Sequence, residues 1–219
     1  MSVPRAIRKI FLAVEQAEGA GARVRRSIGT PQLRNLSPFL MLDHFSIKPG
    51  AGFPDHPHRG QETITYLLQG GVISGQSHGV DSVRDLAYTP VWILDLQVKP
   101  GGKVAQPLPA NWNAFAYVLE GQALFGAGDQ QRPVEQYHNV VLEQEGDVVN
   151  IEVDAGADKD ARVVLIAGTP LDQPVVQYGP FVLSSKEEVY QALQDYQTHS
   201  NGFERAEGWQ SEIGKSMIH

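Results

Sequence analysis

Residues 114–126 read AFAYVLEGQALFG, and this stretch decides the fold class. It holds two apolar runs of strand length, residues 114–119 and 122–125, and a glycine closes each of them. Short apolar runs bounded by glycine are typical of buried strands, because helices need ten or more residues with 3.6-residue periodicity. The stretch therefore predicts two strands joined by a tight turn.

The same pattern continues on both sides of this stretch. Further strand-length apolar runs that end at turn signals lie at residues 72–74, 92–98, 139–142, 148–153 and 162–167. The chain also contains 22 glycines and 14 prolines, which is more turn-forming residues than a helical bundle tolerates. We predict an all-β fold of the sandwich or jelly-roll type.

The first seventy residues predict three more strands. Alternation in Arg23-Val24-Arg25-Arg26 places Arg23 and Arg25 on one face of a strand and Val24 on the other. This strand is either a sheet edge protected by charge or a patch for an anionic partner. Residues 38–45 predict a buried strand, and residues 63–68 predict another that ends at two glycines.

A helix is predicted only near the C-terminus. Ser184 and Glu187 have the spacing of a capping box, with Ser184 as N-cap, and the helix is expected over residues 185–198. The apolar residues Val189, Leu193 and Tyr196 follow at helical spacing. The polar tail after this helix is expected to lie along the surface.

The composition excludes several classes of protein. With 25 acidic and 18 basic residues the net charge is −7, which disfavours direct binding to nucleic acid phosphates. The absence of cysteine excludes disulfides, thiolate metal sites and a cysteine nucleophile. No apolar run is long enough to span a membrane, and the N-terminus lacks a signal-peptide pattern, so we expect a soluble intracellular protein.

One constellation carries chemistry, the segment FPDHPHRGQE at residues 53–62. On an extended strand, His56 and His58 point to the same side, as two neighbouring ligands of one metal ion must. Imidazole donors favour iron, manganese, zinc, nickel or copper over calcium and magnesium. Ordinary surface polarity is the alternative interpretation. Glu62 shares their face, but on a straight strand it lies about 13 Å away, too far for a shared metal ion.

The remaining histidines give weaker signals. His44, His78, His138, His199 and His219 are expected to be structural or exposed. The sequence contains no nucleophile elbow, phosphate-binding loop or His-Glu-x-x-His motif.

At these residues the sequence resembles the pirin family, and the resemblance covers nearly all of residues 1–185. The segments that carry it are Arg23–Gly29, Pro38–Asp43, Gly52–Gly60, Gly75–Val80 and Pro107–Pro109. Residues 50–70 also nearly fit the first sequence motif of the broader cupin superfamily.

The resemblance implies a bicupin, two β-barrels in one chain, with iron in the N-terminal barrel only. The corresponding domains here are a truncated N-terminal cupin domain at 1–72, a C-terminal cupin domain at 73–183, and a helix and tail at 184–219. The family also implies location in nucleus and cytoplasm and iron-dependent co-regulation of transcription through protein partners such as transcription factors. Some members have quercetin 2,3-dioxygenase activity on flavonol-like substrates. Direct binding to nucleic acid or membrane is not expected.

In the family pattern, two iron ligands match His56 and His58, and two more come from a downstream His-x-Glu motif. This chain has no His-x-Glu. An eight-stranded barrel needs roughly 80 residues or more, which residues 73–180 provide and residues 1–71 do not. We predict an incomplete first barrel that exposes strand edges and favours dimerisation, strand swapping or aggregation. Iron binding is then doubtful unless Glu62 or His44 replaces the missing ligands.

Three interpretations of function follow from these residues. The chain is a pirin-type, iron-binding co-regulator, a quercetin 2,3-dioxygenase, or a protein that has lost metal chemistry and keeps its C-terminal barrel as an interaction domain. For this sequence, loss of catalysis is the preferred expectation.

Overall fold

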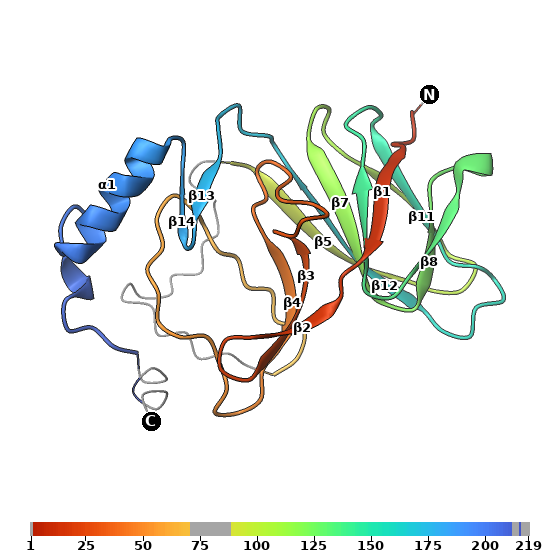
Figure 1. Ribbon diagram of the computed structural model, residues 1–219. Helices are drawn as coiled ribbons and strands as arrows, with labels where there is room; N and C mark the ends of the chain where they lie inside the picture. The colour runs from red at the N-terminus through yellow and green to blue at the C-terminus, as the bar shows by residue number, and fades with distance from the viewer. Residues whose placement is uncertain (1, 71–88, 212–214, 216–219) are drawn as a thin grey trace. The chain divides into compact units, whose positions relative to one another are not determined.

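The computed structural model describes residues 2–70, 89–211 and 215, which form strands β1–β14 and helix α1 (Figure 1). The chain divides into two compact units. The first contains residues 1–17, 23–46 and 85–171, and the second contains residues 18–22, 47–84 and 172–219. These units do not follow chain order, and the domain limits expected from the sequence stay a prediction.

The first unit contains two antiparallel sheets. The five-stranded sheet has the order β1 (Ile7–Leu12), β10 (His138–Leu142), β7 (Asn113–Glu120), β12 (Ala161–Gly168) and β5 (Val91–Val98). The four-stranded sheet has the order β6 (Lys103–Pro107), β11 (Val148–Glu152), β8 (Gln122–Phe125) and β9 (Arg132–Glu135). Both sheets contribute side chains to one apolar core, as in a jelly roll. Within the described residues they do not close into a hydrogen-bonded barrel.

Strand β7 shows why the opening apolar run predicted a buried strand. Ala116 and Val118 point into the core between the two sheets. Phe115 and Tyr117 point to the opposite face, where they pack in a second apolar cluster with Ile28. Because both faces of β7 are covered, its sequence is apolar at every position from 114 to 119 rather than alternating with polar residues.

A three-stranded sheet supplies part of the second cluster. Its order is β2 (Glu15–Glu18), β3 (Ala22–Ile28) and β4 (Leu42–Ser46). Val24 is fully buried and Arg23 is exposed, which confirms the alternation predicted for this strand. The strand predicted at 38–45 is shorter than expected, because Leu36 and Phe39 close a turn with two backbone hydrogen bonds of 2.9 and 2.8 Å.

The second unit contains the hairpin β13 (Val176–Tyr178) and β14 (Phe181–Leu183), followed by α1 (Lys186–Gln197). The helix was predicted correctly, but its N-cap was not. Ser185, not Ser184, accepts the backbone N–H of Glu188, at 3.2 Å, and the Glu188 carboxylate accepts the N–H of Ser184, at 2.9 Å. The capping interaction is therefore shifted by one residue from the predicted box.

The strand predicted at residues 63–68 is wrong. No strand forms there, and residues 62–70 are all exposed. The segment has the composition of a strand, but a strand also needs a neighbour to accept its backbone hydrogen bonds. The strand expected at 72–74 lies outside the described residues. Within those that are described, no helix is long and apolar enough to cross a membrane.

Candidate functional site

His56 and His58 lie on an extended segment held at both ends by backbone bridges. At one end Gly52 and Ala20 exchange two hydrogen bonds, of 2.8 and 3.0 Å. At the other, the carbonyl of Arg59 accepts the N–H of Val182 at 3.0 Å. Between these bridges the segment belongs to no sheet, and its two prolines lack the N–H that a ladder requires.

The two imidazoles lie side by side, as their spacing predicted, although the segment is not a strand. Their ring centroids are 4.6 Å apart, with the planes inclined by 46°. Both side chains are exposed. The pKa of His58 is lowered, first by partial desolvation of its ring and then by the nearby charge of His56. The lowered pKa favours the neutral form of His58, which is the form that binds metal ions.

Each ring has its Nδ1 atom engaged. His56 Nδ1 lies 2.7 Å from the carbonyl oxygen of Pro54. A carbonyl only accepts, so this nitrogen carries the proton and Nε2 keeps a free lone pair. The Gln61 amide nitrogen donates to Nδ1 of His58 and to the Pro180 carbonyl, the latter at 3.2 Å. The proton of neutral His58 is then on Nε2.

Arg59, which directly follows the pair, is bound to the C-terminal part of the second unit. Its guanidinium donates to the Asp195 carboxylate at 2.6 Å and to the carbonyl of Asn201. It also stacks over the ring of Phe203, at 4.2 Å from the centroid. This network could not be predicted from the sequence, because no local pattern relates Arg59 to a residue 136 positions away.

The pair has no third ligand within the described part of the chain. No group of three His, Asp or Glu side chains that could hold a metal ion forms there. Glu62 is exposed, and His44 lies in strand β4 of the first unit. Within the described residues, neither Glu62 nor His44 belongs to a group of three potential metal ligands. His78 lies outside the described residues.

His44 occupies a different environment, built from aromatic and basic side chains. Its Nδ1 lies 3.2 Å from the Tyr117 hydroxyl, and its ring is near that of Tyr137, with centroids 5.9 Å apart. Burial lowers the pKa of His44, and the charge of Arg25 lowers it further. Burial also raises the pKa of Tyr117. His44 is half-buried in this environment.

A shallow hollow of about 420 Å³ lies beside the edge strand β5. Its lining residues are Val91, Trp92, Ile93, Leu94 and Gln106. None of them titrates or binds metal ions readily, so the hollow offers apolar contact and one amide.

Comparisons with known proteins agree with this architecture. Two family profiles match the sequence, "Pirin" over residues 21–85 and "Pirin C-terminal cupin domain" over residues 93–202. A pirin-like protein of Solanum lycopersicum is 37% identical, and the alignment covers 96% of this chain and 97% of that protein. Pirin of Homo sapiens is 35% identical, with 94% and 98% covered.

The alignments are longer than the chain. They run over 288 and 289 positions, whereas this chain has 219 residues. Both relatives therefore contain residues that have no counterpart here.

Two solved structures show the same fold at low sequence identity. A quercetin 2,3-dioxygenase from Acinetobacter baumannii has a TM-score of 0.62 at 16% identity, covering 88% of this chain and 89% of that one. GK1651 from Geobacillus kaustophilus has a TM-score of 0.54 at 19% identity, covering 80% and 100%. At these identities the likeness supports the cupin jelly-roll fold and not an activity.

Proposed function

Because this chain belongs to the pirin family, we propose that it works as a pirin-type cupin that binds protein partners and holds iron only weakly. One observation carries the proposal. His56 and His58 present two imidazoles side by side, and no third His, Asp or Glu joins them in the described residues. Metal affinity depends on the number of ligands, so a pair binds less tightly than a complete set.

The two rings fit part of an iron centre and not the whole of it. Imidazole nitrogen is a suitable iron ligand, and Nε2 of His56 is free to bind. Nε2 of His58 carries a proton while Gln61 donates to the opposite nitrogen, so this ring must change tautomer before that atom binds. The described residues bring no third His, Asp or Glu to the pair.

An incomplete first barrel explains the missing donors. The relatives align over about seventy more positions than this chain has residues, which supports the loss of an internal segment. The exposed apolar residues Ile64, Leu67 and Leu68 also support it, since a complete barrel would bury such a strand. In contrast, the sheets of the first unit surround a continuous buried core.

The proposed partners are proteins, among them transcription factors, and the proposed location is nucleus and cytoplasm. Both the partners and the location are proposed because the chain belongs to the pirin family. The net charge of −7 supports contact with proteins rather than with nucleic acid phosphates.

Iron analysis after loading and desalting tests the metal part of the proposal. We expect well below one iron per chain, and we expect His56→Ala to abolish what remains. The matched control is His138→Ala, which removes an imidazole from strand β10 and should change nothing. One tightly held iron per chain, or oxygen-dependent consumption of quercetin that disappears in His56→Ala, would contradict the proposal and favour a dioxygenase.

Co-precipitation tests the partner part, with transcription factors co-expressed as candidates. We expect wild type and His56→Ala to capture the same proteins to the same extent. Loss of capture in His56→Ala would show that partner binding requires the metal.

A further inference from the structure

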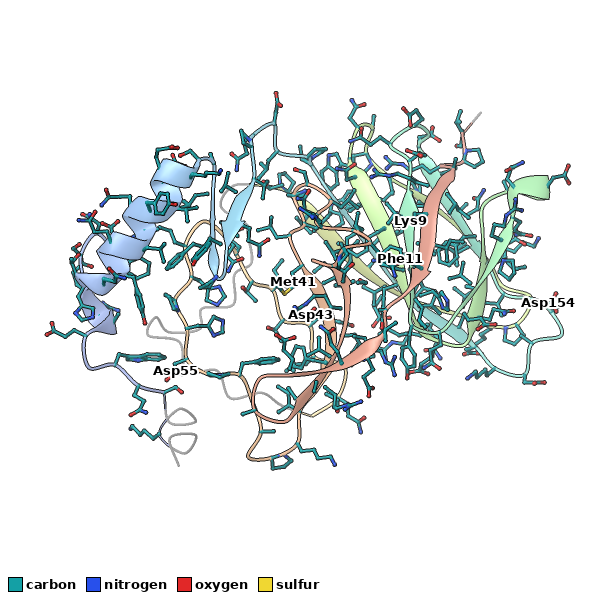
Figure 2. The ribbon with its side chains drawn as sticks, in the orientation of Figure 1. Lys9, Phe11, Met41, Asp43, Asp55 and Asp154 are labelled. Carbon is teal, nitrogen blue, oxygen red and sulfur yellow. The ribbon has the colours of Figure 1, made fainter. Side chains whose placement is uncertain are left out.

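Both charged residues that flank the histidine pair bind the C-terminal segment of the second unit. On one side lies Asp55, which is labelled in Figure 2. Its carboxylate accepts the backbone N–H of Ser211 at 3.0 Å. On the other, Arg59 pairs with Asp195 in helix α1 at 2.6 Å. The three residues between them, which include both imidazoles, are thus fixed at each end to residues 186–211.

The Arg59 attachment is specific in geometry. One terminal nitrogen contacts Asp195 and the other contacts the Asn201 carbonyl, while the guanidinium plane lies over Phe203. A planar guanidinium satisfies these three contacts at once, and a lysine ammonium cannot. Only 25% of the Arg59 side chain is exposed.

Hydrogen bonds from other residues fix the Asp195 carboxylate in the orientation that pairs with Arg59. Its second oxygen accepts hydrogen bonds of 2.8 Å from both Gln191 and Asn201. Only 3% of the residue is exposed. A buried carboxylate with three donors has a fixed position, so the helix gives Arg59 a rigid anchor rather than a mobile surface partner.

The anchor is transmitted to the rings through the backbone. Arg59 is covalently next to His58, and its carbonyl accepts the N–H of Val182 in β14, the second strand of the hairpin that leads to α1. Gln61, two residues further, contacts both His58 and the Pro180 carbonyl. The orientation of the His58 ring is therefore defined by residues of the same C-terminal hairpin.

We propose that Asp195 and Arg59 are positioning residues, through which the C-terminal segment holds the two imidazoles side by side and so sets their affinity for a divalent metal ion. This rests on the proposed function, since it concerns the same pair. It adds that residues on helix α1, which touch neither ring, control the site. A merely structural ion pair would fasten the helix and leave the rings unaffected.

Asp195→Asn tests the proposal, because it keeps the shape of the side chain and removes its charge. The matched control is Asp95→Asn, which breaks the bidentate pair between Asp95 and Arg162 in the first unit. Three quantities are measured: the dissociation constant of Ni²⁺ alone by calorimetry, the NMR signals of the two rings without metal, and hydrogen exchange of residues 55–61.

We expect Asp195→Asn to weaken Ni²⁺ binding by about tenfold, the lower range for loss of a residue that orients a ligand. It should also shift both ring signals and speed exchange in residues 55–61, and Asp95→Asn should do none of these. Arg59→Lys should change the same three quantities by a smaller amount. It replaces Asp195→Asn as the test variant if that substitution unfolds helix α1. Folded Asp195→Asn with unchanged Ni²⁺ affinity and unchanged ring signals would overturn the proposal.

The metal-free signals separate this proposal from the proposed function. If His56→Ala binds Ni²⁺ as tightly as the wild type does, the pair is not a metal site and the proposed function fails. The ring signals and exchange rates in Asp195→Asn still report whether Asp195 positions the pair.

Discussion

The imidazole Nδ1 of His44 lies 3.2 Å from the hydroxyl oxygen of Tyr117, although 73 residues separate them in the chain. The contact joins β4 to β7 beside the second apolar cluster. Arg25 is the direct cross-strand neighbour of His44, and its guanidinium lies 4.0 Å from the centre of the Tyr137 ring. A proton on His44 therefore adds a second positive charge to a half-buried site.

We predict that protonation of His44 destabilises the first unit. The pKa of His44 is lowered in the folded protein, so between that value and 6.5 the unfolded chain binds more protons. The free energy of unfolding should fall as the pH is lowered from 6.5 towards the folded pKa. Above pH 6.5 the stabilising contribution of neutral His44 should be complete. His44→Gln cannot titrate and should flatten this dependence.

Thermal melts between pH 7.5 and 5 measure this effect. His58 also has a lowered pKa and contributes with the same sign, so His58→Gln is the comparison variant. If the pH dependence of the melting temperature persists unchanged in His44→Gln and disappears in His58→Gln, it arises from His58, and our prediction for His44 is wrong.

We predict that protonation of Asp195 destabilises the second unit at a more acidic pH. Hydrogen bonds from Arg59 first, and then from Gln191 and Asn201, lower the pKa of Asp195 to about 2. An unfolded aspartate titrates near 3.8, so the stabilisation is present above that value and is lost as the pH falls through about 2. The helical circular dichroism signal should decrease over this range in the wild type. In Asp195→Asn we expect a lower melting temperature near neutral pH and no transition of this kind.

Much of the fold could be predicted from the sequence, because burial on both faces leaves a local signature. The apolar runs in β7, β10 and β12 each appear as uninterrupted stretches, and those in β5 and β11 remain recognisable although a few polar residues lie within them. Strands such as β6 and β9 were not predicted, since their charged and proline residues hide them among the loops. The N-cap of α1 was placed one residue early because Ser184 and Ser185 are adjacent and both have a glutamate three residues later.

The candidate site could be predicted only in part. The spacing of His56 and His58 predicted that their two rings lie on the same side of the segment, and the rings do lie close together. Nothing local, however, indicates that Arg59 pairs with Asp195, or that Gln61 orients His58. The strand predicted at residues 63–68 failed for a related reason, since strand formation depends on a partner that the local sequence does not specify.

The exposed segment at residues 63–68 predicts self-association. Ile64 and Leu67 are each 51% exposed, and Leu68 is 38% exposed. Clustered apolar side chains on a strand-forming segment favour pairing with another chain. Light scattering should show a molar mass above 24.0 kDa that rises with concentration. The double variant Ile64→Lys, Leu67→Lys should reduce this mass towards that of a monomer.

Tyr190→Lys is the control for this prediction. Tyr190 is 71% exposed but stands alone on the polar face of α1, so its replacement should not change association. A wild type that stays monomeric at all concentrations would contradict the prediction.

Among the glycines that the structure describes, Gly60 is the one at which we expect an added methyl group to lower stability most. Its φ is +79°, and a Cβ there would lie 1.7 Å from the Val182 carbonyl oxygen, against the bridge that holds the histidine segment. Gly50→Ala is the matched control, because Gly50 has φ +83° with no atom within 4 Å of an added Cβ. It should cost only the left-handed strain of about 1–2 kcal/mol.

Gly60→Ala should cost about 1–3 kcal/mol more than this control, the usual penalty of overpacking, because the backbone at Val182 must move. Urea unfolding followed by the helical signal measures both variants. The separation between them isolates the clash from the strain of the left-handed backbone. Equal stabilities would mean that residues 59–60 and 182 are not in contact in solution. In that case the bridge that links the histidine segment to the C-terminal hairpin would not exist.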